Sequence, residues 1–177
     1  MSESLAYSFV NSMIKRISCD QKKRDTACHA ALRRADNPQT ASYAWSYLVP
    51  YCDILSERER LSFSTAAAAL ARECPSINGT ANIGEALYGC CDTNDDRDRE
   101  LKRLCRLLSC DTVPELAAIL RGTIKYIQTK SKVKLNYAML IEDMLYWDKD
   151  KKMKWAKSFY GNIPNNQNAK EVKNVSK

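Results

Sequence analysis

Apolar residues recur every three or four positions along most of the chain, a spacing typical of helices that bury one face. Near the N-terminus the pattern begins at Leu5, after a Ser2 or Ser4 cap. In the first half of the chain it predicts helices over 5–17, 21–35, about 40–49 and 56–70. Ser56 followed by Glu59 further predicts a capping box at the start of the Ala-rich fourth helix.

The second half of the chain continues in the same way. Pro75 and Asn78-Gly79 predict a loop over 74–82, and a second, acidic loop is expected over 90–96. Helices are predicted over 82–88, from about 97 to 108, from 112 to 127, from 136 to 145 and from about 150 to 160. No strand pattern appears in the sequence, so we expect an all-α fold: a compact bundle of about seven to nine helices without a sheet.

A length of 177 residues predicts a single domain. We place it at 1–161, with an N-terminal sub-bundle at 1–73 and a C-terminal basic sub-bundle at 97–161 as a candidate subdivision. Residues 162–177 are rich in Asn and Lys and are predicted to form a disordered tail. Only 5 Gly and 5 Pro are present, too few for the turns of a β-sandwich or barrel.

Residues of the kinds that carry catalysis are scarce. The one histidine, His29, follows Cys28, and adjacent helical side chains diverge too far to act as nucleophile and base. The same divergence separates Glu142 from Asp143, and the acidic run 92–98 lacks the glycine and terminal Glu of a calcium loop. No glycine-rich phosphate loop occurs. We therefore expect no catalytic residue and no cofactor.

Eight cysteines are present, but none are spaced as paired zinc ligands. The N-terminus has no continuous apolar core of a signal peptide, and no apolar run is long enough to cross a membrane. We expect free thiols that pack as small, buried or half-buried hydrophobic groups, no metal, and a cytoplasmic protein without a membrane partner.

Positive charge is the strongest functional signal. The net charge is +7, and residues 97–160 hold 15 Lys and Arg against 8 Asp and Glu. One predicted helix carries a row three or four residues apart without acidic partners on that face: Arg99, Lys102, Arg103 and Arg106. Another begins with Lys149, Lys151, Lys152 and Lys154, where cations oppose the helix dipole, so local stability does not explain them. Either these rows solubilise the surface, or they bind nucleic-acid phosphates without reading bases.

The order of short motifs resembles the CasB family, the small subunit of the type I-E CRISPR surveillance complex Cascade. The resemblance covers about 5–161. Its motifs are Ala31-Leu32-Arg33-Arg34-Ala35, Tyr47-Leu48-Val49-Pro50, Ala69-Leu70-Ala71, Ile83-Gly84-Glu85-Ala86-Leu87, the segment 103–108, the segment 115–121, and 140–147 followed by a basic helix with Trp155 and Tyr160. Leu104 departs from the family, which usually has an aromatic there, and Glu85 replaces a basic residue of some relatives.

The resemblance implies a non-catalytic helical protein that lies along guide CRISPR RNA and target DNA and helps to hold the displaced strand. It also implies a second copy of the chain and the Cascade backbone and large subunits as partners. The residues carried over to nucleic-acid binding are Arg33, Arg34, Arg103, Arg106, Arg121 and, more loosely, Lys149, Lys151 and Lys152; the charge pattern adds Arg99 and Lys102. Of Arg33 and Arg34, one is expected to contact nucleic acid and the other a protein or a salt-bridge partner. A helical protein–protein adaptor and a DNA-binding regulator without a CRISPR role are the alternatives.

Overall fold

A computed structural model describes residues 4–17, 20 and 22–161. The elements are α1 (Leu5–Arg16), α2 (Thr26–Leu32), the 3-10 helix η1 (Ala41–Ala44), α3 (Trp45–Leu48), α4 (Glu57–Glu73), α5 (Ile83–Tyr88), α6 (Asn94–Leu108), α7 (Val113–Lys130), α8 (Tyr137–Leu145) and α9 (Lys149–Tyr160). The only β-type pairing in these ranges is an isolated bridge between Ala81 and Leu135. The all-α prediction is confirmed; the predicted tail 162–177 lies outside the described residues.

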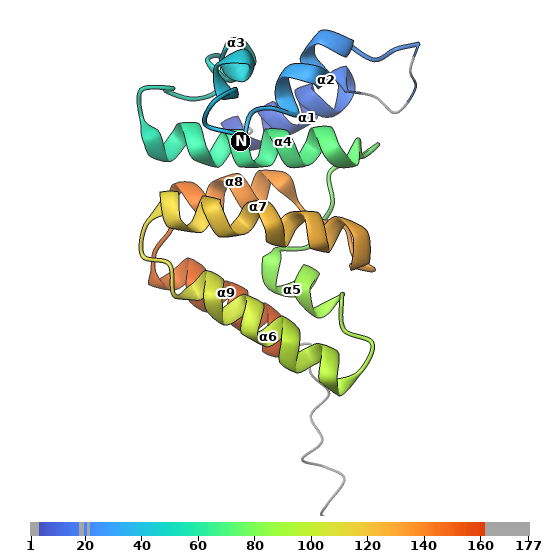
Figure 1. The fold of residues 1–177 in the computed structure, drawn as a ribbon, viewed down its shortest axis with the longest axis vertical. Helices are drawn as coiled ribbons and strands as arrows, with labels where there is room; N and C mark the ends of the chain where they lie inside the picture. The colour runs from blue at the N-terminus through green and yellow to red at the C-terminus, as the bar shows by residue number, and fades with distance from the viewer. Residues whose placement is uncertain (1–3, 18–19, 21, 162–177) are drawn as a thin grey trace, which may run out of the picture.

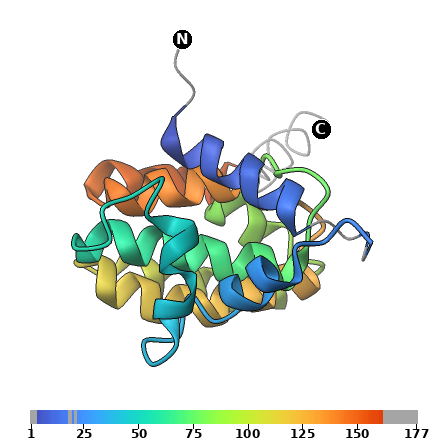
Figure 2. The same ribbon diagram turned by 90° about the horizontal axis from the view of Figure 1, so that it is seen from above.

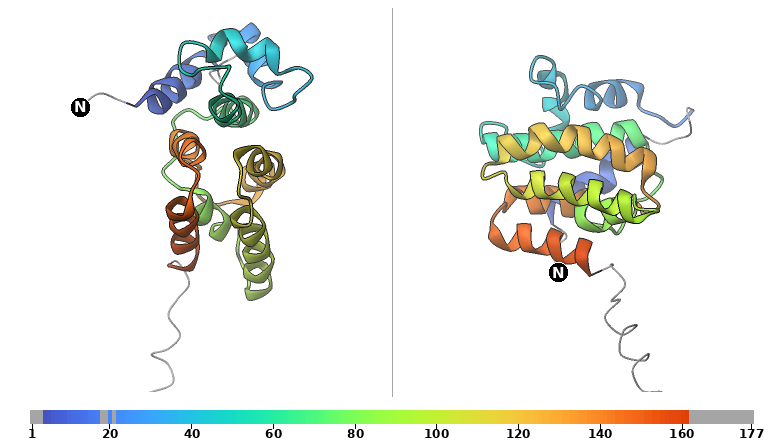
Figure 3. Two further views of the ribbon diagram at one scale, coloured as in Figure 1. Left: turned by 90° about the vertical axis from the view of Figure 1, so that its left-hand side faces the viewer. Right: turned by 60° about the horizontal axis from the view of Figure 1, so that its bottom comes forward.

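The helices are stacked in layers (Figure 1). α1, α2 and α3 lie across one side of α4, and α7 and α8 run side by side along its other side. Beyond them α6 and α9 flank the short α5, as the end-on view in Figure 3 shows. Seen from above, α1 and α2 cross over α4 (Figure 2).

Helix α4 is at the centre because its middle is made of alanine. Every residue of 66–71 is buried, and α4 contacts α1, α2, α7 and α8. Small side chains let four helices approach one backbone closely, so larger core residues come from the surrounding helices. Phe9 of α1 is one example: its ring packs edge-on against Phe63, with the ring centroids 5.2 Å apart.

Capping side chains explain most of the helix starts. Asn82 with Glu85 and Thr112 with Glu115 form complete capping boxes at α5 and α7. The box predicted at Ser56 is incomplete, because the Glu59 carboxylate accepts from the Asp53 backbone N–H at 2.8 Å instead of from Ser56. Ser56 still caps α4 by accepting from the Glu59 N–H.

Helix α6 begins at Asn94, three residues before its predicted start. Thr93 and Asp96 form a capping box inside the segment predicted as an acidic loop. The hydrogen bond from Thr93, aided by those from Arg99 and the backbone, lowers the pKa of Asp96 to about 2, so this carboxylate is charged at neutral pH. The acidic run is therefore helix-capping, and its negative charges complement the positive end of the helix dipole.

Other boundaries differ from the prediction as well: α4 continues to Glu73 and α7 to Lys130, and α2 is shorter than predicted. Helix α2 spans only Thr26–Leu32, since the side chain of Asp25 caps it and turns follow Leu32. Helix α9 starts at Lys149, where Asp148 accepts from the Lys151 N–H at 2.9 Å. Within the described ranges, no helix has the length and apolar character needed to cross a membrane.

Helices α5 and α9 are in direct backbone contact at Gly84. A Cβ atom at this position would lie 2.0 Å from the carbonyl oxygen of Trp155. The nearby aromatic side chains of α9, Trp155 and Phe159, are fully buried. A glycine is therefore required for this helix pair to close.

Candidate nucleic-acid interface

The predicted cationic row on α6 is present at the surface, but two of its members have acidic partners. Arg99 pairs with Asp96, and the Nε atom of Arg103 lies 3.3 Å from Oε2 of Glu100. Both partners precede the arginine by three residues and lie on the same side of the helix. The prediction of a row without acidic partners is therefore wrong for Arg99 and Arg103.

Arg103 is held by two groups at once. The Glu100 side chain is 1% exposed and accepts a hydrogen bond of 2.6 Å from the hydroxyl of Tyr126 on α7. The guanidinium carbon of Arg103 lies 4.2 Å from the centre of the Tyr126 ring. Burial and the neighbouring carboxylate raise the pKa of Tyr126, so its phenol remains a donor to Glu100. Arg103 is thus a surface cation with a fixed position.

Lys102 and Arg106 are the unpaired members of the row. Both are exposed, lie four residues apart and have no ion pair among the residues that the structure describes. They point away from the buried positions Leu104 and Leu107. The apolar spacing of this helix predicts that Leu101, Leu104, Cys105 and Leu108 form its buried face. In the structure Leu104 is buried, but Leu101 and Leu108 are only half-buried and Cys105 is exposed.

In the turns after α2, one carboxylate pairs with arginines of both α4 and α7. Asp36 pairs with Nη1 of Arg72 at 2.8 Å and with Nε of Arg121 at 3.5 Å. Arg121 is exposed and therefore combines a structural ion pair with a surface position. Arg33 and Arg34 are both exposed, and neither has a salt bridge in the described part of the chain. Arg34 instead lies over the ring of Tyr43.

Lys125 belongs to the same surface and was missed by the sequence reasoning. It lies one turn after Arg121 on α7, is exposed, and has no ion pair with any described residue. Helix α7 contacts α6, where Arg103 reaches Tyr126. The spacing of four residues between Arg121 and Lys125 is a sequence signal that could have found it. The cations of α6 and α7 therefore occupy neighbouring helices (Figure 3).

The lysines of α9 have a structural role that the sequence did not reveal. Asp143 on α8 is 1% exposed and accepts a hydrogen bond of 2.7 Å from the indole N–H of Trp155. Lys151 and Lys154 lie 3.3 Å and 3.2 Å from the same carboxylate. The prediction that local stability does not explain these lysines is wrong for Lys151 and Lys154, because they neutralise a buried charge.

Lys149 and Lys152 lie where α9 approaches the end of α6. Lys152 pairs with Asp111 at 3.0 Å, and its Nζ atom is 5.8 Å from the centre of the Trp147 ring. The positive charges of Lys152 and Arg106 both counteract the burial that raises the pKa of Cys110. Lys149 is exposed and has no ion pair among the described residues. The beginning of α9 is therefore close to the end of the α6 row.

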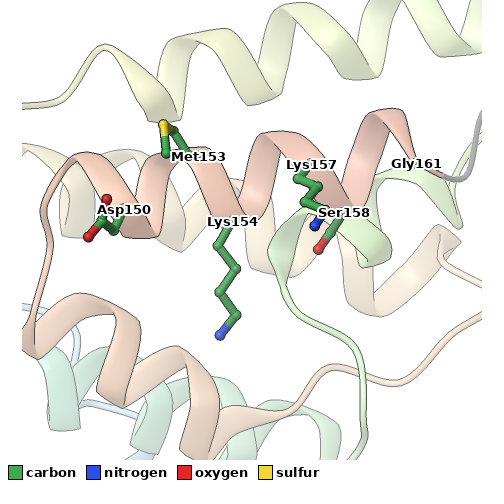
Figure 4. A pocket seen from close by; sticks show the side chains of 6 residues that line it. All are labelled: Asp150, Met153, Lys154, Lys157, Ser158 and Gly161. Atoms are coloured by element: carbon green, nitrogen blue, oxygen red, sulfur yellow. The ribbon is translucent and has the colours of Figure 1, made fainter.

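A recess along α9 does not assemble a catalytic group. Asp150, Met153, Lys154, Lys157, Ser158 and Gly161 line it, and all belong to α9 or its end (Figure 4). Their side chains point in different directions along one helix rather than toward a common point. The Ser158 hydroxyl accepts a hydrogen bond of 2.7 Å from the Asn82 amide, and Lys154 is held by Asp143.

His29 has a cysteine neighbour, but it is Cys74 rather than Cys28. Its Nε2 atom lies 3.4 Å from the Cys74 sulfur and 2.9 Å from the Ala71 carbonyl oxygen. A carbonyl accepts only, so Nε2 carries a proton and cannot take one from the thiol. This geometry gives the pair no general base.

The remaining cysteines do not favour nucleophilic or metal chemistry. Burial raises the pKa of Cys28, Cys52 and Cys90 to about 11, which keeps these thiols protonated. Six cysteines in the described ranges are free thiols, whereas Cys19 lies outside these ranges; the six are Cys28, Cys52, Cys90, Cys91, Cys105 and Cys110. The exposed Cys105 departs from the expectation of buried or half-buried thiols. Among the described residues, no three His, Cys, Asp or Glu side chains are grouped as metal ligands.

These features define an all-helical protein that presents lysine and arginine side chains on its surface. The sequence profile of the CRISPR-associated protein Cse2 family matches residues 29–160. The chain therefore belongs to the Cse2 family, which confirms the resemblance found in its motifs.

Solved structures share the fold. CasB from Thermus thermophilus is 23% identical, with a TM-score of 0.69 over 90% of this chain and 99% of that one. CasB from M. ruber is 16% identical, with a TM-score of 0.67 over 93% and 99%. A chain of a CRISPR RNA-guided surveillance complex is 20% identical, with a TM-score of 0.71 over 89% and 92%. Comparison with curated proteins gives no match.

Proposed function

We propose that this chain is the small subunit of a Cascade-type CRISPR surveillance complex and acts there as a non-catalytic nucleic-acid-binding protein. Its family membership and the fold that it shares with a chain of a CRISPR RNA-guided surveillance complex support this role. The ligands are guide CRISPR RNA and target DNA, including the displaced strand. A second copy of the chain and the backbone and large subunits are its protein partners, in the cytoplasm.

The observation that carries the proposal is the set of unpaired cations on α6 and α7. Lys102, Arg106 and Lys125 are exposed and have no ion pair in the described part of the chain. An exposed cation without an internal partner is free to neutralise a phosphate and release its counterion. Such contacts position a backbone and do not read bases. This fits a subunit that must accept any guide and target sequence.

The test uses a double variant, Lys102→Ala with Arg106→Ala, in the full chain. Arg103 is left in place, because its removal would leave Glu100 buried without its cation. We expect weaker binding to mixed-sequence DNA, measured by fluorescence anisotropy over a range of salt concentrations. Each lost phosphate contact should flatten the log–log salt dependence by about one unit, so the double variant should lose about two.

The matched control is Lys15→Ala with Lys157→Ala. These lysines are also exposed on helices, have no ion pair among the described residues and lie on α1 and α9, away from the α6–α7 surface. Equal loss of binding in both double variants would indicate a diffuse effect of net charge and contradict the proposed surface. Unchanged binding in the α6 variant would favour the protein–protein adaptor.

A further inference from the structure

The segment formed by η1 and α3 exposes aromatic side chains far from the α6 row. Tyr43 is 61% and Trp45 is 39% exposed, which is unusual for side chains of this size. The segment lies beside α2 on the opposite side of α4 from α7 (Figures 1 and 2). Residues 37–52 contain no acidic residue. The patch is therefore aromatic and free of negative charge of its own.

Arginines lie over the rings of two tyrosines in this segment, the exposed Tyr43 and the half-buried Tyr47. The guanidinium carbon of Arg34 is 5.2 Å from the centre of the Tyr43 ring, and that of Arg16 is 5.0 Å from the centre of the Tyr47 ring. Tyr43 lies in η1, and Tyr47 follows four residues later in α3. We call these four residues the stacking platform.

The environment of the platform is positively charged. Arg16 is paired with Asp25 at 3.0 Å, yet its side chain remains 45% exposed. Arg34 and its neighbour Arg33 have no ion pair with any described residue. The nearby Asp36 is occupied by Arg72 and Arg121. The charge left over at the patch is therefore cationic.

We propose that the stacking platform binds the unpaired bases of single-stranded nucleic acid. A planar guanidinium held over a tyrosine offers its other face to a base, and the charge that remains attracts the phosphates on either side. Stacking on aromatic and arginine planes tolerates any base, whereas the bases of a duplex are already stacked and unavailable. This inference rests on the proposed function and extends it. The cations of α6 and α7 bind phosphates, and the stacking platform is a second site that binds unpaired bases.

A protein partner is the main competitor, because Tyr, Trp and Arg are also frequent at protein interfaces. Such a partner would need acidic groups to meet Arg33 and Arg34. The repeated arginine–tyrosine geometry and the excess of positive charge favour nucleic acid. The protein alternative is one of the outcomes of the test below.

The test compares single-stranded with duplex binding by the full chain. The probe is a fluorescent oligo-dT of about 15 nucleotides, and the comparison is a duplex of the same length. Tyr43→Ala should weaken oligo-dT binding about tenfold, since stacking contributes about 1–3 kcal/mol per base, and leave duplex binding unchanged. Tyr43→Phe keeps the ring and should bind like the unmodified chain.

Two further variants sharpen the result. Arg34→Lys keeps the charge but loses the planar group. If the platform stacks on bases, this variant should bind oligo-dT more weakly. If Arg34 only contacts a phosphate, its binding should be unchanged. Tyr146→Ala is the control, because Tyr146 is 65% exposed at the end of α8 and should have no effect. None of the tyrosine variants changes charge, so the salt dependence should keep its slope.

The outcomes separate this inference from the proposed function. If Lys102→Ala with Arg106→Ala has no effect while Tyr43→Ala still weakens oligo-dT binding, the phosphate surface fails and the platform stands. If Tyr43→Ala leaves oligo-dT binding intact, or weakens single strands and duplex equally, the platform is refuted. Loss of assembly with the other subunits at unchanged oligo-dT binding would assign the patch to a protein. No measurable binding by the unmodified chain contradicts both.

Discussion

Asp143 shows how one buried carboxylate can decide the role of several surface lysines. It joins α8 to α9 by accepting the Trp155 indole N–H, and Lys151 and Lys154 neutralise it. When one member of a buried charged group is removed, the others are left without partners. This loss destabilises the protein by more than the complete group stabilises it. Lys151 and Lys154 therefore stabilise the fold through their contact with Asp143.

Asp143→Ala should lower the free energy of unfolding by about 3–5 kcal/mol, because it leaves a buried indole N–H unsatisfied and two lysines unneutralised. Chemical denaturation followed by circular dichroism measures this. Asp98→Ala is the control: Asp98 is exposed on α6, and its loss should change stability by no more than about 0.5 kcal/mol. Similar values for the two variants would contradict the role of the Asp143 cluster.

At the scale of the helices, the glycine inside α5 is tightly packed against a neighbouring helix, whereas the glycine inside α7 faces open space. A Cβ atom on Gly84 would meet the Trp155 carbonyl oxygen at 2.0 Å, whereas a Cβ atom on Gly122 has nothing within 4 Å. Gly84 is required by the contact of α5 with α9. Gly122 lies on the exposed face of α7, where glycine only weakens the helix.

Gly84→Ala should therefore destabilise the protein, by at least the roughly 1–3 kcal/mol typical of overpacking. Gly122→Ala should stabilise it by about 0.4–1 kcal/mol, because alanine is the better helix former and restricts the unfolded chain. The midpoints of thermal unfolding should move in opposite directions. A gain in stability from Gly84→Ala would mean that α9 is not held against α5 as described.

The helices themselves could be predicted from the sequence, because apolar spacing and capping residues are local. The boundary of α6 was misplaced because an Asp-rich stretch reads equally well as a loop, although Thr93 and Asp96 were there to cap a helix. The pairing of Arg103 with Glu100 has a sequence signal in their spacing of three residues. Contacts of Tyr126 with Glu100, or of Lys151 with Asp143, depend on how separate helices pack and have no such signal.

On the scale of the whole molecule, α4 connects the layers on either side of it. Its alanines are buried against α1 and α2 on one side and against α7 and α8 on the other. Each layer therefore needs α4 in place to bury its own apolar surface. We expect the described helices to unfold in one cooperative transition rather than layer by layer.

Ala68→Leu tests this connection. Ala68 is fully buried, so the larger side chain should cost about 1–3 kcal/mol and lower the unfolding midpoint while leaving a single transition. Ala30→Leu, at an exposed position on α2, should change stability by less than about 0.5 kcal/mol. Two separate transitions in the Ala68→Leu variant, seen as different midpoints for fluorescence and circular dichroism, would show that the layers fold independently.

Because Glu100 and Tyr126 hold Arg103 in place, this side chain loses conformational entropy during folding rather than during ligand binding. A free arginine side chain on a surface gives up about 2 kcal/mol of rotational freedom when a ligand immobilises it. Arg103 has given up much of that freedom when the chain folds, because its neighbours already hold the guanidinium. The side chains of Lys102 and Arg106 keep their rotational freedom in the folded protein and lose it only on contact with a ligand. A strand that reaches α6 would therefore meet one cation already in position beside two that must be ordered on contact.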